Sequence, residues 1–222
     1  MREHVLRIAV LGTGVVGTTL ATGFVRTGHE VRLGSRTAGN EKSVAWVAAT
    51  GAGASEGTFA DAASWGDVVV NATGGLVSIE ALTAAGAESL AGKVLLDVSN
   101  PLDYSEGFPP RVVQPDGRSL AEQIQSTFPD ARVVKTLNTM NTVVMTDPRL
   151  LAGPHTVFVA GNDAEAKALA ADLLRGFGWG SEEILDVGGI SGSRGLELYL
   201  ALWLTLIGSF GTPAFNVSVV RA

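Results

Sequence analysis

The chain has 222 residues, with 16 basic and 22 acidic side chains, so its formal net charge is −6. Hydrophobic residues make up 46% and charged residues 17%, which excludes a disordered or fibrous chain and predicts a globular one. The absence of cysteine excludes a disulfide framework, a thiolate metal site and a cysteine nucleophile. Because the charge balance is acidic, we expect no nucleic-acid partner.

No segment is expected to enter a membrane. The N-terminal apolar run is short and leads into a glycine motif rather than a cleavage site. The longest apolar run, Leu198 to Phe210, has 13 residues, whereas a membrane span needs about 20. We therefore expect a cytoplasmic protein.

Short β-branched runs alternate with alanine-rich runs along the chain. The former predict strands covered on both faces, at residues 6–11, 30–34, 67–71, 93–98, 132–137 and 156–160. Helices are predicted between them. Asn40 is expected to cap the second helix, and Asn162 with Glu165 is expected to form a capping box at a helix over residues 163–175. This alternation predicts a doubly wound α/β fold with a parallel sheet.

A glycine-rich loop follows the first predicted strand and opens the first predicted helix. It reads Gly12-Thr13-Gly14-Val15-Val16-Gly17. The first glycine permits a tight turn, the second lets a pyrophosphate approach the backbone, and the third lets the helix pack closely. A helix N-terminus also offers free N–H groups to phosphates. The loop therefore predicts a dinucleotide site of the Rossmann type rather than a turn without a ligand.

The end of the second predicted strand indicates which dinucleotide is bound. A site for NAD usually offers an acid about 20 residues after the glycine loop, to hold the ribose. Here the chain instead places Ser35 and Arg36. Arg36 can pair with a 2′-phosphate in a bond worth about 1.5–3 kcal/mol, or about ten- to a hundredfold in affinity. We predict NADP(H), the alternative being a solvated arginine beside a turn serine.

Polar and small residues follow the other predicted strands, at the sheet edge where α/β proteins bind ligands. Ala72, Thr73 and Gly74 are expected beside the cofactor. Asn100 and Asn138 are candidates to bind the nicotinamide amide or a substrate carbonyl, and each has the alternative role of a cap or turn residue. For Lys135, a structural or anion-binding role is favoured over proton transfer.

Residues suited to nucleophilic or metal catalysis are missing. His4, His29 and His155 stand apart, without a carboxylate or second histidine at ligand spacing. We therefore predict no metal and no catalytic side chain. Hydride transfer between two cofactors tolerates this absence, because the cofactors carry the chemistry.

Two glycine- and proline-rich stretches interrupt the alternation. Residues 100–118 predict a long ordered loop or lid, and residues 186–195 precede an apolar helix over 196–208. That helix must be covered by its own domain or by a partner subunit. We expect an N-terminal Rossmann domain over residues 1–140 that binds NADP, and a small α/β C-terminal domain over residues 141–222 for substrate binding and dimerisation.

Five segments together resemble the coenzyme F420-dependent NADP oxidoreductase family, whose fold also occurs as the reductase domain of the Steap metalloreductases. They are residues 12–17, 34–36, 97–101, 135–138 and 186–194 with the apolar helix that follows. The resemblance implies a homodimer that moves a hydride between NADP(H) and a deazaflavin. Asn40 departs from the family pattern, because it stands where a second basic residue is expected beside the 2′-phosphate.

The resemblance also assigns residues to the two ligands. Residues expected to hold NADP are Thr13, Val15, Val16, Ser35 and Arg36. Residues expected around the deazaflavin are Asn138, Thr139, Met140 and the loop after Asn100, which begins at Pro101. Ser193 and Arg194 match a Ser-Arg pair that opens the C-terminal helix and are expected to reach the site or the dimer partner.

Three functions remain open from the sequence. The leading hypothesis is an NADP-dependent reductase of a deazaflavin (F420) or flavin. A reductase of small imines or carbonyls usually needs a larger helical second domain, whereas 222 − 138 = 84 residues follow Asn138. The third hypothesis is a non-catalytic sensor that binds NADP(H) and a partner protein. A sensor needs no second ring-sized cavity facing the nicotinamide, whereas a reductase does.

Overall fold

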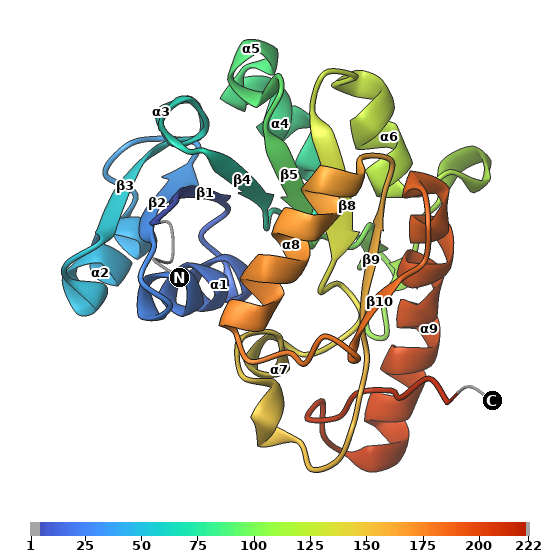
Figure 1. The fold of residues 1–222 in the computed structure, drawn as a ribbon. Coiled ribbons are helices and arrows are strands. Elements are labelled where there is room, and N and C mark those ends of the chain that lie inside the picture. Colours follow the sequence, from blue (N-terminus) through green and yellow to red (C-terminus); the bar gives the residue numbers. More distant parts are fainter. Residues whose placement is uncertain (1–4, 221–222) are drawn as a thin grey trace.

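The computed structural model describes residues 5–220, and across them eight strands form one sheet in the order β10-β9-β8-β5-β4-β1-β2-β3 (Figure 1). The strands are β1 (Arg7–Leu11), β2 (Glu30–Ser35), β3 (Ala54–Thr58), β4 (Val68–Asn71), β5 (Val94–Asp97), β8 (Arg132–Thr136), β9 (Val157–Gly161) and β10 (Ile184–Asp186). From β3 to β8 all neighbours are parallel. The predicted doubly wound α/β fold is confirmed.

Helices cover both faces of the sheet. They are α1 (Val15–Arg26), α2 (Glu41–Thr50), α3 (Phe59–Trp65), α4 (Ser78–Ala85), α5 (Ala87–Leu90), α6 (Leu120–Thr127), α7 (Thr142–Thr146), α8 (Ala164–Gly176) and α9 (Ser193–Phe210). One buried cluster joins the sheet to α1, α2, α7 and α8, and another joins it to α3, α4, α5 and α6. Along β1, Ile8 and Val10 enter the first cluster while Ala9 and Leu11 enter the second, as the two-residue period of a strand requires.

The sequence patterns missed β3 and β10. The strand β3 reads ASEGT and contains no apolar run, because it pairs only with β2 at the sheet edge. The strand β10 has three residues, Ile184–Asp186, and pairs with β9 at the opposite edge. Edge strands bury less of their surface, so their apolar signal is weak.

The segment after residue 140 extends the same sheet. The strand β9 pairs antiparallel with β8, with Lys135 opposite Ala160, and β10 lies parallel to β9. The C-terminal strands thus continue the N-terminal sheet without a break. The domain boundary expected at residue 140 stays a prediction.

One of the two predicted helix caps is correct. The side chain of Asn40 accepts hydrogen bonds from the backbone N–H groups of Lys42 and Ser43 and caps α2. The capping box predicted for α8 is wrong, because Asp163 caps that helix through the N–H of Ala166. The Oδ1 atom of Asn162 instead accepts from the N–H of Ile190 at 2.9 Å and ties the loop before α9 to β9.

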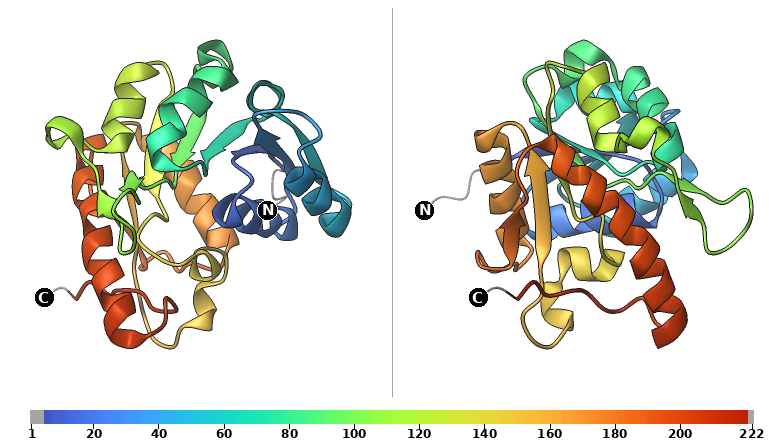
Figure 2. Two further views of the ribbon diagram at one scale, coloured as in Figure 1. Left: turned by 180° about the vertical axis from the view of Figure 1, so that it is seen from behind. Right: turned by 90° about the vertical axis from the view of Figure 1, so that its right-hand side faces the viewer.

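The predicted loop over residues 100–118 contains an antiparallel hairpin of β6 (Leu102–Asp103) and β7 (Arg111–Val112), whose tip projects from the body of the molecule (Figure 2). The helix α9 runs along the side of the molecule past this hairpin (Figure 1). Within residues 5–220, no helix is both long and apolar enough to cross a membrane.

Candidate functional site

The glycine loop has the steric features that a phosphate-binding turn requires. Gly12 has a φ of 118°, and a Cβ atom there would lie 2.5 Å from the carbonyl oxygen of Ala72. A Cβ atom at Gly17 would lie 1.9 Å from the carbonyl oxygen of Gly12, so α1 can pack this closely only with glycine. At Gly14 a Cβ atom would meet no atom of the described chain within 4 Å. The backbone at Gly14 therefore faces open space.

The N-terminus of α1 opens onto that space. No side chain caps it, and its first turn contains no acidic residue. Its free N–H groups and positive dipole end are thus available to an anion. The first cavity, of about 580 Å³, lies here and is lined by Gly12, Thr13, Gly14, the turn after β2, the start of α3, and Ala72 to Gly74 with α4.

The turn after β2 supplies a cation to the first cavity. Arg36 lines the cavity, is exposed, and forms no hydrogen bond or ion pair with the described part of the chain. Ser35 also lines it, but its hydroxyl donates to the carbonyl of Thr37 at 2.6 Å. Asn40 lines the same wall while it caps α2. Arg36 is therefore the side chain here best placed to meet a phosphate.

A second cavity, of about 300 Å³, adjoins the first. The two share Ala72, Thr73 and Gly74 as a common wall. The second cavity brings together segments far apart in sequence, namely Val16, Gly75, Val98 to Asn100, Leu102, Tyr104, Asn138, Met140 to Thr142, Met145, Leu200 and Trp203. Most of its wall is apolar, and its polar side chains follow the ends of β4, β5 and β8, except for those of Tyr104 and Trp203.

The structure brings most of the predicted residues to these cavities, but not all of them. Gly12, Thr13, Gly14, Ser35 and Arg36 line the first, while Val16, Asn100, Asn138 and Met140 line the second. Residues that line neither are Val15, which is exposed at the start of α1, and Pro101, Thr139, Ser193 and Arg194.

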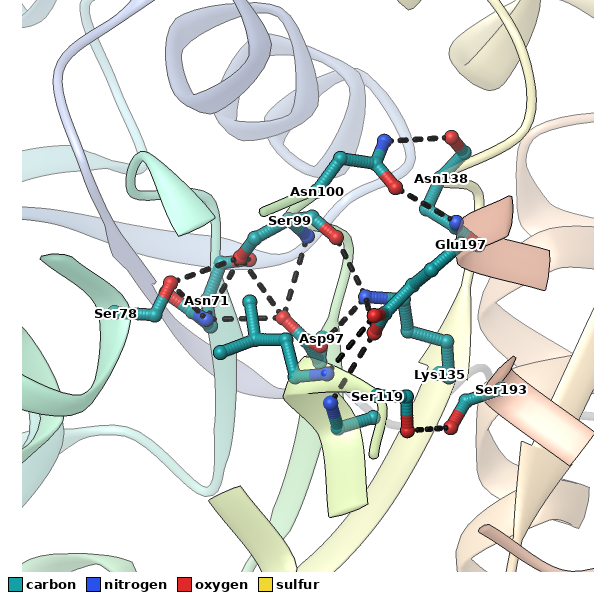
Figure 3. A network of polar contacts seen from close by, with 12 residues as sticks. Asn71, Ser78, Asp97, Ser99, Asn100, Ser119, Lys135, Asn138, Ser193 and Glu197 are labelled. Carbon is teal, nitrogen blue, oxygen red and sulfur yellow. Dashed lines mark hydrogen bonds and ion pairs between the residues drawn. The ribbon is translucent and has the colours of Figure 1, made fainter. Parts of the chain in front are cut away.

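A buried hydrogen-bond network fixes the wall that the cavities share (Figure 3). The Nδ2 atom of Asn71 donates to Ser78 Oγ at 3.0 Å, Asp97 Oδ1 at 2.9 Å and Ser99 Oγ at 2.8 Å. Its Oδ1 atom accepts from the hydroxyl of Thr73 at 2.7 Å. The side chain of Thr73 is thus oriented by groups at the ends of β4 and β5, and the shared wall is rigid.

The same network contains a buried lysine between two buried carboxylates (Figure 3). Lys135 Nζ lies 2.8 Å from Asp97 Oδ2 and 2.9 Å from Glu197 Oε1, and all three side chains are fully buried. Burial alone would lower the pKa of Lys135, but the charges of Asp97 and Glu197 outweigh it, so the pKa lies above its usual value. Lys135 lines neither cavity, which supports its structural role.

Glu197 ties α9 to the rest of the molecule. Its carboxylate accepts from the N–H groups of Leu120 at 2.8 Å and Ala121 at 3.2 Å, at the start of α6. It also pairs with Lys135, so one side chain joins α9, α6 and the end of β8. The position of the α9 residues Leu200 and Trp203 at the second cavity therefore depends on a buried ion pair.

The pair that opens α9 has partners outside the cavities. The hydroxyls of Ser193 and Ser119 lie 2.6 Å apart, and both residues are fully buried. Arg194 donates to Glu122 through two nitrogens at 2.7 and 2.5 Å. This bidentate bond lowers the pKa of Glu122 to about 2. Both residues thus hold α9 against α6.

Among residues 5–220, no group of three or more His, Cys, Asp or Glu side chains is placed to hold a metal ion. His4 lies outside the described residues. His155 is buried, with one ring nitrogen 3.0 Å from the carbonyl of Pro148 and the other 2.9 Å from Asn216. It thus belongs to the packing of the C-terminal tail rather than to either cavity.

Sequence reasoning missed the functional residues that come from α9. Leu200 and Trp203 line the second cavity, and Glu197 pairs with Lys135. One signal was present in the sequence. Lys135 follows two valines in a predicted strand and Glu197 stands between two leucines, and charges in such apolar surroundings are stable in a core only when paired.

Open space at Gly14 beside an uncapped helix N-terminus places the protein among the Rossmann-type dinucleotide-binding proteins. Residues 7–101 match the family described as "NADP oxidoreductase coenzyme F420-dependent". A solved structure from Arthrobacter sp. FB24, provisionally described as an F420-dependent NADP-reductase, is 48% identical, with a TM-score of 0.91 over 97% of this chain and 100% of that chain. The chain therefore belongs to the F420-dependent NADP oxidoreductase family.

The chain spans less than two thirds of the length of two curated relatives that it matches. Metalloreductase STEAP3 of Rattus norvegicus is 31% identical over 93% of this chain and 38% of its own length. The F420-dependent NADP reductase of Methanocaldococcus jannaschii is 29% identical over 66% of this chain and 64% of its own length. The imine reductase of Myxococcus stipitatus shares the fold alone, with 17% identity and a TM-score of 0.65 over 94% of this chain and 64% of that chain.

Proposed function

We propose that the protein transfers a hydride between NADP(H) and a deazaflavin or flavin acceptor. The observation that carries the proposal is the second cavity, which shares the wall of Ala72, Thr73 and Gly74 with the first. Two ligands held in adjoining cavities react as if in a single molecule, which removes much of the entropic barrier. The relatives described as F420-dependent NADP reductases support the deazaflavin as acceptor.

The residues of the first cavity fit NADP(H). The space at Gly14 and the uncapped start of α1 suit a pyrophosphate, and unpaired Arg36 suits a 2′-phosphate. When bound, NADPH supplies a hydride from C4 of its nicotinamide. Asn40 is the residue that departs from the family pattern, and Arg36 would therefore carry most of the preference for NADP over NAD.

The residues of the second cavity bind, orient and exclude water. Val16, Val98, Met145 and Leu200 provide apolar walls that keep water from the site. No side chain is required to form a covalent bond, because a hydride passes directly between two rings and the reduced acceptor then takes up one proton from the medium. The Lys135 ammonium, held by two carboxylates, stays out of the reaction.

The second cavity also favours this function over the two alternatives. A non-catalytic sensor has no need of a ring-sized space beside the cofactor site. Imine reduction has support from the fold only, because the similar imine reductase is 17% identical and this chain spans 64% of it. A reductase of a deazaflavin or flavin uses both cavities and also agrees with the family of the chain.

We also propose that the protein is a homodimer, through the free face of α9. Leu198 and Leu202 lie one helical turn apart on that face, and each is 53% exposed. Adjacent exposed leucines on a helix are typical of a subunit interface. Sedimentation should give twice the chain mass, and replacing both leucines by glutamate should give the monomer. A monomeric wild-type protein would contradict this assignment.

The proposed reaction is tested by the oxidation of NADPH, followed by absorbance, with F420, FMN, FAD or a ferric chelate as acceptor. Rapid turnover with F420 alone would support the deazaflavin. Turnover with flavin or ferric chelate would keep the cofactor and change the acceptor. NADPH binding without turnover of any acceptor would contradict the proposal and favour the sensor.

A further inference from the structure

The side chain of Asn138 in the wall of the second cavity has a fixed orientation. Its Nδ2 atom donates to Asn100 Oδ1 at 2.9 Å and to the carbonyl oxygen of Leu196 at 3.0 Å. Asn100 in turn donates to the backbone carbonyl of Asn138 at 2.8 Å (Figure 3). Both N–H groups of the Asn138 amide are thus used, and a flipped amide would set its oxygen against two acceptors.

The Oδ1 atom of the same side chain has no hydrogen-bond partner among the described residues, although Asn138 is only 2% exposed. A buried acceptor without a partner costs free energy and is uncommon in folded proteins. The residue before it, Leu137, has a φ of 61°, which non-glycine residues rarely adopt. The chain therefore combines local strain at Leu137 with an unpaired acceptor on the next residue, Asn138, which lines the cavity.

The cavity also contains an unpaired donor. Trp203 lines the cavity from α9, and its Nε1–H group has no partner among the described residues. Asn138 and Trp203 both line the cavity, and between them they carry an unpaired acceptor and an unpaired donor. A planar amide, which carries an N–H and a C=O side by side, matches this combination. A ligand with only carbonyl groups would leave Asn138 Oδ1 unsatisfied.

We propose that Asn138 is a specificity-determining residue whose Oδ1 atom accepts a hydrogen bond from the N–H of a planar amide in the ligand. This inference rests on the proposed function. Two parts of the ligands share this chemistry, namely the carboxamide of the nicotinamide and the imide edge of a flavin or deazaflavin. The hydrogen bonds of both N–H groups favour this role over that of binding a substrate carbonyl, which the sequence left open for Asn138.

The test compares ligands that differ at a single N–H group. The first pair is NADPH and its 3-acetylpyridine analogue, in which a methyl group replaces the carboxamide NH2. The second pair is FMN and N3-methyl-FMN, with binding measured in the presence of saturating NADP. Dissociation constants are measured by fluorescence and calorimetry for the wild type and for Asn138→Leu. One hydrogen bond predicts that the wild type binds one of the modified ligands about three- to tenfold more weakly.

Asn216 offers a matched control. Its Nδ2 atom lies 2.9 Å from His155 Nδ1 and donates to the carbonyl of Thr156 at 3.0 Å, and its Oδ1 atom also has no partner among the described residues. Asn216 lines neither cavity. Asn216→Leu removes the same groups at a distance from the ligands and should keep the full discrimination, whereas Asn138→Leu should lose it.

The outcomes separate the two sources and the two claims. If the wild type binds NADPH more tightly than its 3-acetylpyridine analogue and Asn138→Leu does not, the hydrogen bond goes to the nicotinamide carboxamide. If the same difference is found between FMN and N3-methyl-FMN, the hydrogen bond goes to the imide edge. Equal binding of both pairs by the wild type, or discrimination that survives in Asn138→Leu, overturns the inference. Failure of the wild type to bind NADPH would instead overturn the proposed function.

A second measurement uses the wild type alone and so does not depend on the folding of the variant. The side-chain amide resonances of Asn138, assigned by NMR, should shift with one ligand of a pair and much less with its modified partner. Equal shifts with both partners in each pair would contradict the hydrogen bond.

Discussion

The two cavities are built in different ways, although they share one wall. The phosphate end of the first cavity is largely backbone, from residues 12–14 that are adjacent in sequence. The second is lined by five separate stretches of the chain, within residues 16, 72–75, 98–104, 138–145 and 200–203, and α9 is held beside it by the Glu197–Lys135 ion pair. Adjacent glycines can be identified as a motif, whereas a site assembled by tertiary packing leaves no local pattern. Substitutions that add atoms to the glycine loop should therefore disturb the first cavity. Substitutions that break the buried ion pair should disturb the second.

The largest effect is expected from Lys135→Met. The substitution leaves the buried carboxylates of Asp97 and Glu197 without their cation, which should lower the free energy of unfolding by about 3–5 kcal/mol. Urea unfolding followed by circular dichroism measures this loss. Lys167→Met is the control, because its pair with Asp186 is partly exposed, and it should cost less than about 1 kcal/mol. Similar losses in both variants would show that the buried cluster does not hold the second cavity together.

The same substitution at two glycines should separate packing from ligand binding. Gly17→Ala places a Cβ atom 1.9 Å from the carbonyl oxygen of Gly12 and should lower the free energy of unfolding by about 1–3 kcal/mol. Gly14→Ala meets no described atom within 4 Å and has an extended backbone that alanine adopts readily, so stability should change by less than about 0.5 kcal/mol.

For Gly14→Ala we expect NADPH binding to weaken by about tenfold or more, because the new methyl group occupies the space of the ligand. Thermal unfolding and fluorescence titration measure the two properties. If Gly14→Ala bound NADPH as tightly as the wild type, the assignment of the cofactor phosphates to this loop would be wrong.

A smaller and more selective effect is expected from Arg36→Ala. Loss of the charge-assisted bond to the 2′-phosphate should weaken NADPH binding by about ten- to a hundredfold and NADH binding by less than about twofold. Lys42→Ala is the control, because Lys42 is exposed on α2 and does not line the first cavity. If Arg36→Ala weakened both cofactors equally, the assignment of Arg36 to the 2′-phosphate would be wrong.

The smallest effect is expected from the pair that holds α9 to α6. The Arg194 guanidinium lowers the pKa of Glu122 from its usual 4.5 to about 2, so the pair stabilises the fold above pH 4.5. That contribution should disappear as the pH falls from about 4.5 to about 2, because the carboxylate becomes protonated. Melting temperatures between pH 5 and pH 2 should fall more steeply for the wild type than for Glu122→Gln. If the melting temperatures of the two proteins fell in parallel with pH, the Arg194–Glu122 pair would not stabilise the fold.

The sequence predicted those parts of the molecule that depend on local patterns. The positions of the central strands along the chain, the glycine loop and the cap at Asn40 follow from periodicity and from side chains that act on their own neighbours. The edge strands β3 and β10 carry too few apolar residues to be recognised. The cap at Asp163 was missed because a tertiary contact with Ile190 occupies the competing Asn162.

The candidate site divides in the same way. Arg36 and Gly14 could be predicted as site residues because one follows a strand and the other precedes a helix, and both line the first cavity. The roles of Glu197, Leu200 and Trp203 depend on how α9 packs against the rest of the molecule. That packing is decided by contacts between residues far apart in the chain, such as Asn138 and Leu196, which are 58 positions apart. Pairing of isolated buried charges is the one principle that could have joined α9 to β8 before the structure was known.

We propose that the two adjoining cavities hold NADP(H) and the acceptor at the same time. The most direct test is initial-rate kinetics with NADPH varied at several fixed concentrations of whichever acceptor is reduced. The shared wall of Ala72, Thr73 and Gly74 predicts a ternary complex, and so double-reciprocal lines that intersect. Parallel lines, which indicate that NADP leaves before the acceptor binds, would contradict the claim.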